Sequence, residues 1–206
     1  YYSGGGAKFG AAGDFVTAPT LSPLFGQTLA VQINALLPQT AGVVYEFGAG
    51  NGALAATLLQ SLDSTQLKQY CIIELSAELA ARQRQYLAEH APASAHKVVH
   101  LDRLPEILDG VIIGNEVLDA MPVSVVRWQA NGIEEMGVVQ QASQFEWAAR
   151  PLADPALLAM AAPWAAQLPP GYTSELHPQQ QAFITTLAHK LARGAIIMID
   201  YGFDAA

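Results

Sequence analysis

The chain has few charged residues, a single cysteine and no long apolar run. Charged residues make up 14% of its 206 positions and apolar residues 51%, a balance that excludes an intrinsically disordered chain. The lone cysteine, Cys71, excludes a disulfide framework and a cysteine-based zinc site. No apolar run approaches the ~20 residues that a membrane-spanning helix needs, so we expect no membrane span.

Basic residues are also scarce. Ten Lys and Arg stand against eighteen Asp and Glu, and the net charge of −8 argues against binding to a nucleic-acid backbone. The negative charge is compatible with a cationic group on a partner protein, or with a surface that only keeps the chain in solution. The five histidines lack metal-ligand spacing, so we predict no metal site.

The most informative stretch begins as the apolar run Val43–Phe47 and ends in three glycines, Gly48, Gly50 and Gly52. An apolar run that stops at alternating glycines and continues in a helical pattern is typical of a buried strand that turns into a helix around a nucleotide-like ligand. Glycine adopts positive φ angles easily, so these positions allow a sharp bend and a close approach of a ligand to the backbone.

Similar segments follow along the chain. Predicted strands cover residues 43–47, 69–75, 97–101 and 110–114, and predicted helices cover 52–62 and 76–89. Strands that alternate with helices at this spacing predict βαβ units, and therefore an α/β fold with a mostly parallel sheet and helices on both faces. Within these segments we expect Cys71 to be a small core residue, and Arg82, Gln83 and Arg84 to face outward.

The flanking regions have different patterns. Residues 1–20 are rich in glycine and predict a loop, whereas Ser22 and Pro23 are suited to begin a helix that Pro38 ends. The pair Asn131-Gly132 predicts a hairpin. The other predicted elements are antiparallel strands at 123–129, 133–140 and 144–150, helices at 154–166 and 178–192, the second closed by Gly194, and a buried strand at 195–201.

The glycine turn alone leaves the ligand open. Residues 48–53 match the dinucleotide pattern G-x-G-x-x-G/A, and Glu74 follows where a ribose-binding acid belongs. Glu46, however, lies two residues before the turn, where a carboxylate would repel a pyrophosphate. S-adenosylmethionine carries an ammonium and a sulfonium group instead, and Asp102 is placed to accept from the adenine amino group. The acids together favour S-adenosylmethionine over NAD, although each singly fits a solvated loop position.

Several longer blocks are more specific and resemble the MidA family of class I S-adenosylmethionine-dependent methyltransferases. They are Gly13-Asp14-Phe15-Val16-Thr17-Ala18-Pro19, Ser22-Pro23-Leu24-Phe25-Gly26, Glu46-Phe47-Gly48-Ala49-Gly50, Asn115-Glu116-Val117-Leu118-Asp119-Ala120 and Ile199-Asp200-Tyr201-Gly202. That family includes a mitochondrial assembly factor that methylates an arginine on a subunit of respiratory complex I.

The resemblance implies a Rossmann-like methyltransferase fold and one methyltransferase domain over residues 1–206. Its expected parts are a glycine-rich lid at 1–20, a cofactor-binding core at 43–122 and a small antiparallel hairpin insertion at 123–150. Because the family normally continues past Asp204, we expect the C-terminal part of the fold to be absent from this chain.

The resemblance and the strand ends together suggest two sets of site residues. The expected cofactor-binding residues are Glu46, Gly48, Ala49, Gly50, Glu74, Leu75, Asp102 and Asn115, with Asp14, Phe15 and Thr17 from the lid. The expected catalytic residues are Glu116 and Asp119, which would hold the substrate cation, and Asn115, which would orient it or contact the cofactor. Glu116 and Asp119 would alternatively cap a helical turn.

We also predict roles for four polar residues outside these two sets. Glu175 is a further candidate for the substrate site, Glu134 and Glu135 are expected to be surface charges of the hairpin, and His100 is expected to be structural.

The leading hypothesis is a methyltransferase that uses S-adenosylmethionine to methylate an arginine of a partner protein, by family analogy a complex I subunit. The alternatives are an NAD-dependent oxidoreductase and a non-catalytic assembly factor that binds S-adenosylmethionine, and a small-molecule methyl acceptor is also open. The expected location is the bacterial cytoplasm, or the mitochondrial matrix if the source is eukaryotic.

Overall fold

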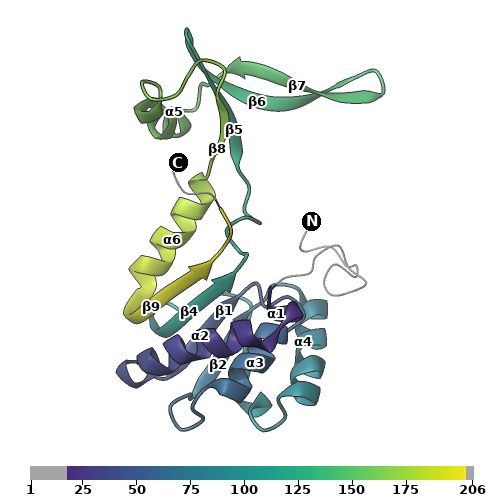
Figure 1. The fold of residues 1–206 in the computed structure, drawn as a ribbon, viewed down its shortest axis with the longest axis vertical. Coiled ribbons are helices and arrows are strands. Elements are labelled where there is room, and N and C mark those ends of the chain that lie inside the picture. Colours follow the sequence, from purple (N-terminus) through teal and green to yellow (C-terminus); the bar gives the residue numbers. More distant parts are fainter. Residues whose placement is uncertain (1–17, 203–206) are drawn as a thin grey trace. The chain divides into compact units, whose positions relative to one another are not determined.

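The computed structural model describes residues 18–202, which divide into two compact units. The first unit runs to Asp119 and resumes at Leu187, and the second is Ala120–Thr186. The chain therefore leaves the first unit, builds the second and returns, as the colour gradient in Figure 1 shows. The expectation of one methyltransferase domain over the whole chain stays a prediction.

The first unit contains a five-stranded sheet in the order β3-β2-β1-β4-β9, with every neighbouring pair parallel. Its strands are β1 (Val43–Phe47), β2 (Gln69–Ile73), β3 (Val98–Leu101), β4 (Leu108–Asn115) and β9 (Leu191–Ile199). Successive strands extend the sheet to one side of β1 and then to the other, so the direction of winding changes between β1 and β4. In such sheets ligands bind at the carboxyl ends of the strands beside this switch point. The predicted Rossmann-like α/β fold is confirmed.

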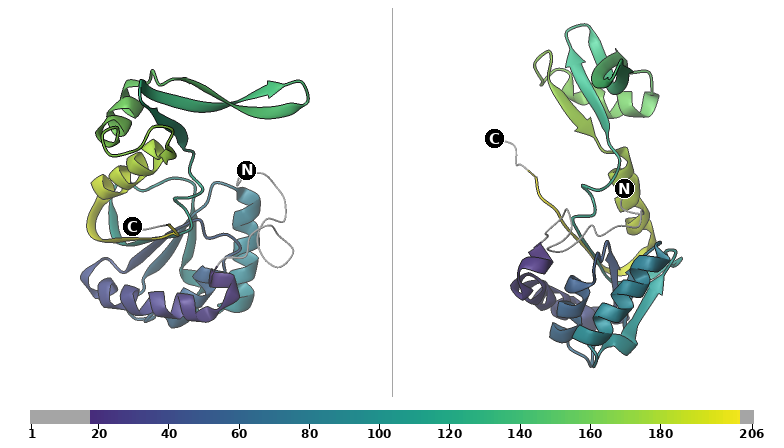
Figure 2. Two further views of the ribbon diagram at one scale, coloured as in Figure 1. Left: turned by 45° about the horizontal axis from the view of Figure 1, so that its top comes forward. Right: turned by 90° about the vertical axis from the view of Figure 1, so that its right-hand side faces the viewer.

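Helices pack on one face of this sheet (Figures 1 and 2). They are α2 (Pro23–Leu36), α3 (Ala53–Ser61) and α4 (Ala77–His90), with shorter pieces at α1 (Ala18–Leu21), η1 (Leu37–Gln39) and η2 (Ala95–Lys97). Ile33 of α2 and Leu58 of α3 are fully buried in the same cluster as Val44 of β1. Full burial of each such side chain stabilises the fold by about 1.5–3 kcal/mol.

The start of α2 follows its sequence signals. The Ser22 side chain accepts a hydrogen bond from the Leu24 amide at 3.2 Å, and Pro23 occupies the first helical position. These two residues satisfy or remove donors that would otherwise lack partners. The described end of the predicted 1–20 loop differs from expectation, because residues 18–21 form a helical turn.

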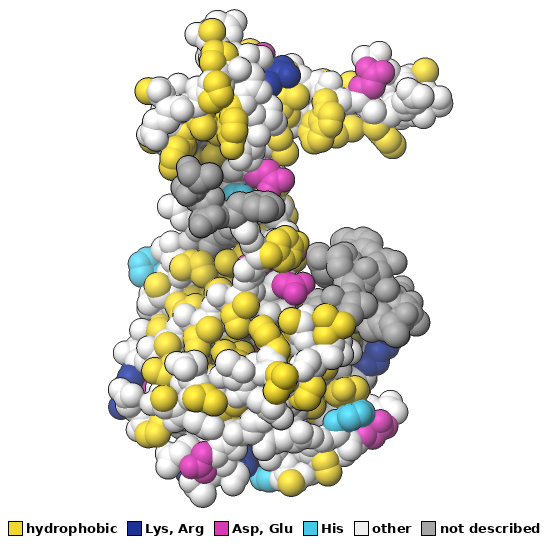
Figure 3. All heavy atoms as spheres, in the orientation of Figure 1, with side chains coloured by type: hydrophobic (Ala, Val, Ile, Leu, Met, Phe, Trp, Pro, Cys, Tyr) yellow, Lys and Arg dark blue, Asp and Glu magenta, His cyan; other side chains and the backbone are white. Residues whose placement is uncertain are grey.

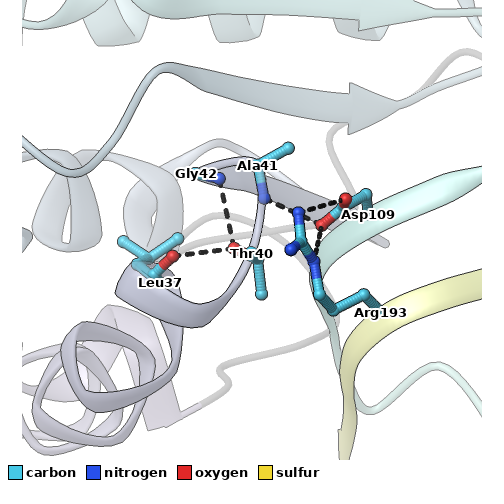
Figure 4. Close-up of polar contacts among 6 residues, drawn as sticks. All are labelled: Leu37, Thr40, Ala41, Gly42, Asp109 and Arg193. Atoms are coloured by element: carbon cyan, nitrogen blue, oxygen red, sulfur yellow. Dashed lines mark hydrogen bonds and ion pairs between the residues drawn. The ribbon is translucent and has the colours of Figure 1, made fainter.

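The carboxylate of Asp109 forms hydrogen bonds that link three strands at the amino-terminal end of the sheet. Asp109, at the start of β4, accepts two hydrogen bonds from the guanidinium of Arg193 in β9, at 3.2 and 2.8 Å. The same carboxylate accepts the Ala41 amide at 2.8 Å, just before β1 (Figure 4). These bonds lower the pKa of Asp109, the largest cause being the bond from Arg193. One side chain thus ties together the starts of three adjacent strands.

Two sequence expectations in this unit are wrong. Gly194 does not close a helix: α6 (Pro178–Lys190) ends earlier and β9 begins at Leu191, so Gly194 lies inside the strand with φ +132°. A Cβ at position 194 would lie 1.8 Å from the Gly110 carbonyl oxygen of β4, so only glycine fits at this position. Gln83 does not face outward but is fully buried. Its side-chain amide is hydrogen-bonded within the protein, for example to the Gly50 carbonyl, which makes this burial possible.

The second unit contains an antiparallel sheet in the order β7-β6-β5-β8. Its elements are β5 (Ser124–Gln129), β6 (Gly132–Gln141), β7 (Gln144–Pro151), β8 (Thr173–Leu176), α5 (Pro155–Ala161), η3 (Ala162–Trp164) and the first part of α6. The predicted hairpin at Asn131-Gly132 is confirmed, since Gln129 pairs with Gly132 across it. The helix expected over 154–166 is shorter, and Pro163, which lacks an amide donor, lies in the 3-10 turn that follows it.

One face of the β6–β7 hairpin is apolar and exposed. Val138 pairs with Trp147, and both side chains are exposed, as is Phe145 two residues before Trp147. Figure 3 shows apolar side chains gathered along this hairpin. The core of the unit lies elsewhere, around Val126 and Trp128, whose indole N–H donates to the Ala161 carbonyl at 3.0 Å.

Candidate active site at the carboxyl ends of the strands

The glycine turn between β1 and α3 has the geometry that its sequence predicts. Gly48, Gly50 and Gly52 have φ angles of +65°, +56° and +91°, which residues with side chains rarely adopt. A Cβ on Gly48 would also lie 2.8 Å from a methyl carbon of Val117. The Asn51 side chain accepts the Ala53 amide at 3.0 Å and so begins α3. The tight turn between β1 and α3 therefore depends on glycine at these three positions.

The predicted cofactor-binding residues follow strands that end together. One row of register partners crosses four strands at Phe47, Ile73, Leu101 and Gly114. The residues that come next along the chain are Gly48, Glu74 and Asp102, which follow β1, β2 and β3, and Asn115, which is the last residue of β4. Since parallel strands end at the same edge, the structure brings these four positions to one edge of the sheet.

The acids at this edge differ in their surroundings. Glu74 is held, because its Oε1 accepts the Ser76 amide at 2.8 Å and its own amide donates to the Leu101 carbonyl at 3.0 Å. Asp102 is exposed and pairs with Arg103 at 3.2 Å, a surface contact that holds the carboxylate only loosely. Leu75, beside Glu74, is 81% exposed.

Glu46 lies deeper than the sequence suggested. Its side chain is 1% exposed, and Oε2 accepts a hydrogen bond from the Tyr70 hydroxyl at 2.7 Å. Burial raises the pKa of Glu46 to about 7, while the bond from Tyr70 opposes the rise. The carboxyl therefore has a partner within the protein, and contact between Glu46 and the cofactor stays a prediction.

The segment after β4 carries the predicted catalytic residues. Glu116 has φ +52°, and its amide donates to the Ile199 carbonyl of β9 at 2.8 Å. Partial burial, followed by the nearby Asp119 charge, raises the pKa of Glu116. No helix begins between residues 116 and 123, so the alternative that Glu116 and Asp119 cap a helix is wrong.

Two residues that were not expected in the site come from the end of β9. Asp200 Oδ2 accepts the amides of Leu118 and Asp119 at 3.0 and 3.2 Å. The Tyr201 hydroxyl donates to Asp119 Oδ2 at 2.5 Å, and this bond raises the pKa of Tyr201 to about 12. Polar residues directly after the predicted strand at 195–201 were the available signal for both. That strand, β9, ends at Ile199 and is only partly buried, so the expectation of a buried strand to residue 201 is wrong. The carboxylates of Glu116, Asp119 and Asp200 therefore lie together at the end of β4, the strand that pairs with β1.

The remaining candidate residues lie in the second unit or outside the described residues. Glu175 lies in β8 of the second unit, 3.8 Å from His177. Glu134 and Glu135 form ion pairs within the hairpin sheet, with Arg127 and Arg150, as expected of surface charges. Asp14, Phe15 and Thr17 lie outside the described residues.

Across residues 18–202 no group of three His, Cys, Asp or Glu side chains is arranged to hold a metal ion. Within the same range, every helix is too short or too polar to cross a bilayer. Cys71 is free and buried in β2, as predicted.

A parallel sheet wound from β1 in both directions, with a glycine turn and carboxylates at its carboxyl edge, defines a Rossmann-like fold. A family described as "putative S-adenosyl-L-methionine-dependent methyltransferase" matches residues 24–206. The chain belongs to this family, and the cofactor of the family is the one that the sequence predicts.

Individual relatives agree with this placement. A structure of a protein from Burkholderia thailandensis bound to S-adenosyl-homocysteine is 48% identical, with a TM-score of 0.88 over 98% of this chain and 54% of that one. A native structure from the same organism is 48% identical, with a TM-score of 0.82 over 95% and 53%. A mitochondrial protein arginine methyltransferase NDUFAF7 homologue from Caenorhabditis elegans is 28% identical over 56% of this chain. The chain spans about half of the two solved proteins and 32% of the curated relative.

Proposed function

We propose that this chain is an S-adenosylmethionine-dependent methyltransferase that methylates an arginine side chain of a partner protein. The assignment of the cofactor rests on the shared edge of the sheet, where the glycine turn, the residues after β2 and β3, and the last residue of β4 lie together. Support for the acceptor comes from the group of carboxylates after β4 and from the arginine methyltransferase among the relatives.

Each part of the edge suits one part of the cofactor. Gly48 and Gly50 have the positive φ angles of a tight turn and carry no side chain that would keep the methionyl part away from the backbone. The carboxylate of Glu74 would accept from ribose hydroxyls, Asp102 from the adenine amino group, and Asn115 would contact the methionyl end. When bound, the cofactor supplies an electrophilic methyl group on a sulfonium, whose sulfur keeps the electron pair of the broken bond.

The carboxylates after β4 address the main difficulty of arginine as a methyl acceptor. Its guanidinium is a poor nucleophile because the lone pairs are delocalised over three nitrogens. Hydrogen bonds from two guanidinium nitrogens to Glu116 and Asp119 would hold the group in place. They would also draw the positive charge onto those two nitrogens, which leaves the third nitrogen more nucleophilic. Methylation exchanges one proton of that nitrogen for the methyl group. Glu116, whose pKa is raised, is suited to accept the proton.

Cofactor binding is tested by calorimetry of the whole chain with S-adenosylhomocysteine. We expect micromolar affinity, and we expect Gly48→Val to abolish it because valine disfavours the φ of +65° at this position and its side chain would collide with Val117. Gly137→Val is the matched control, since Gly137 has open space around it. Absence of binding by the unaltered chain would overturn the proposal, and thermal protection by NAD instead would favour an oxidoreductase.

The acceptor is tested by mass spectrometry of methylated peptides from cells with and without the protein. An arginine methylated only in cells that contain it, and lost with Asp119→Asn, would support the proposed substrate. Cofactor binding without any methylated product would favour a non-catalytic assembly factor.

The partner that we propose by family analogy is a complex I subunit. The corresponding compartment is the bacterial cytoplasm, or the mitochondrial matrix in a eukaryote. In support, the relative from Caenorhabditis elegans is named as a mitochondrial protein.

A further inference from the structure

Gln83 is the polar residue whose burial the sequence did not predict. It lies on α4 between the exposed residues Arg82 and Arg84, yet its own exposed fraction is 0%. A buried amide is costly unless its donors and acceptor are hydrogen-bonded. Its partners therefore show what this side chain does.

The Gln83 amide has three partners, which come from three different segments. Nε2 donates to the Gly50 carbonyl at 2.9 Å and to Glu74 Oε2 at 3.3 Å. Oε1 lies 3.0 Å from His100 Nε2 in β3. Because the Gly50 carbonyl can only accept, the NH2 group of Gln83 must face it, and His100 must then carry a proton on Nε2. Both donors and the acceptor of the amide are used.

These partners belong to the proposed cofactor edge. Gly50 is the central glycine of the turn after β1, and Glu74 is the acid after β2. The Ser76 amide holds Oε1 of Glu74 while Gln83 holds Oε2, so the carboxylate is fixed from two sides. His100 immediately precedes Leu101, the last residue of β3, and so lies two positions before Asp102. One side chain therefore connects the ends of three neighbouring strands.

We propose that Gln83 is a positioning residue of the cofactor site, which sets the Glu74 carboxylate and the Gly50 peptide in the orientation that binds the ribose and the methionyl part of S-adenosylmethionine. The inference rests on the proposed function, because it assigns Gln83 to the same site. It acts through Glu74 and the turn and does not touch the cofactor. Ordered groups lose less freedom on binding, so their orientation contributes directly to affinity.

The first test replaces Gln83 by methionine, which has a similar length and shape but cannot make the three hydrogen bonds. We expect Gln83→Met to weaken S-adenosylhomocysteine binding by about tenfold or more, as loss of a supporting shell around a ligand-binding group typically does. The control is Gln85→Met on the same helix. Gln85 is exposed, and its side chain donates a hydrogen bond to Glu89 Oε1 at 3.1 Å. Calorimetry supplies the affinities, and circular dichroism shows that each variant is folded at the temperature used.

A double-mutant cycle separates positioning from a purely structural role. If Gln83 acts through the acid, Gln83→Met should cost clearly less affinity in a Glu74→Gln background than in the unaltered protein. Equal fold losses in the two backgrounds would overturn the proposal, as would unchanged affinity in Gln83→Met alone. If Gln83→Met does not fold, Gln83→Glu replaces it, because it keeps an acceptor toward His100 but has no donor for Gly50 or Glu74. Lack of binding by the unaltered chain would instead refute the proposed function.

Discussion

At the scale of single residues, the buried carboxyl of Glu46 links protonation to stability. Burial raises its pKa from 4.5 to about 7. Between these values the folded protein holds a proton that the unfolded chain has released, so the free energy of unfolding falls as the pH rises through this window and levels off above it. The total change is on the order of 3 kcal/mol, since one pKa unit corresponds to about 1.36 kcal/mol.

Glu46→Gln removes this titration while keeping an acceptor for the Tyr70 hydroxyl. We expect a flatter dependence of the free energy of unfolding on pH from 5 to 7, and a variant more stable than the unaltered protein at pH 8. Urea unfolding at pH 5, 6, 7 and 8 measures both, with Glu89→Gln on the exposed side of α4 as the control. Parallel pH profiles for Glu46→Gln and the unaltered protein would contradict the expectation.

Tyr201 tests the acceptor side of the site. Tyr201→Phe removes the hydroxyl that donates to Asp119 and leaves the ring. Because Asp119 belongs to the proposed acceptor site, we expect slower arginine methylation but S-adenosylhomocysteine affinity within about twofold of the unaltered protein, the scatter usual for substitutions away from a contact. Tyr172→Phe in the second unit is the control. A parallel loss of cofactor affinity would show that Tyr201 does not act on the acceptor alone.

At the scale of elements, the β4–β9 pair depends on the absence of a side chain at Gly194. Gly194 pairs with Gly110, and a Cβ on Gly194 would overlap the Gly110 carbonyl. β9 can therefore pair closely with β4 only because Gly194 lacks a side chain. Gly110 needs to be glycine for a different neighbour, since a Cβ there would lie 2.1 Å from the Val43 carbonyl oxygen of β1. The same strands carry Asp109 and Arg193 at their starts and Asn115 and Ile199 at their ends, so a change in their pairing would reach the segment with the proposed catalytic residues.

Gly194→Ala should destabilise the protein by about 3 kcal/mol or more, because it combines a strained φ of +132° with a backbone overlap. Gly137→Ala in β6 has open space and should change stability by less than about 1 kcal/mol. Urea unfolding compares the two variants. If Gly194→Ala were as stable as Gly137→Ala, the close approach of β4 and β9 would be in doubt.

At the scale of the whole molecule, the two units differ in what they contribute. The residues assigned to the cofactor all lie in the first unit, apart from those outside residues 18–202. The second unit has its own core around Trp128 and an apolar hairpin face. Cofactor binding should therefore protect the two units unequally.

Hydrogen exchange measures this difference. With S-adenosylhomocysteine at about 100 times its dissociation constant, linkage adds about 2.7 kcal/mol to the stability of the binding-competent fold. We expect slower exchange in the glycine turn and at the ends of β2 and β3, with little change in β6 and β7. Protection confined to the second unit would contradict the assignment of the cofactor to the first.

Much of the fold was predictable because its signals are local. The strand at residues 43–47, the turn at 48–52 and the hairpin at Asn131-Gly132 each depend on a few adjacent residues, and the structure confirms them. The ends of elements were less accurate: β2 stops at Ile73 and β4 extends beyond the predicted 110–114 at both ends. Strand pairing decides these ends, and pairing depends on residues far along the chain.

By itself the sequence determined the class of fold, the position of the glycine turn and the acids that follow the strands, because periodicity and glycine spacing act over short distances. Only the tertiary structure decided the burial of Gln83, the contact of Gly110 with Gly194 and the meeting of Asp200 with the segment after β4. Asp200 and Leu118 are 82 positions apart. Such contacts arise from packing the parallel sheet and its helices together, and no local pattern specifies which polar side chains that packing will enclose or bring to one edge.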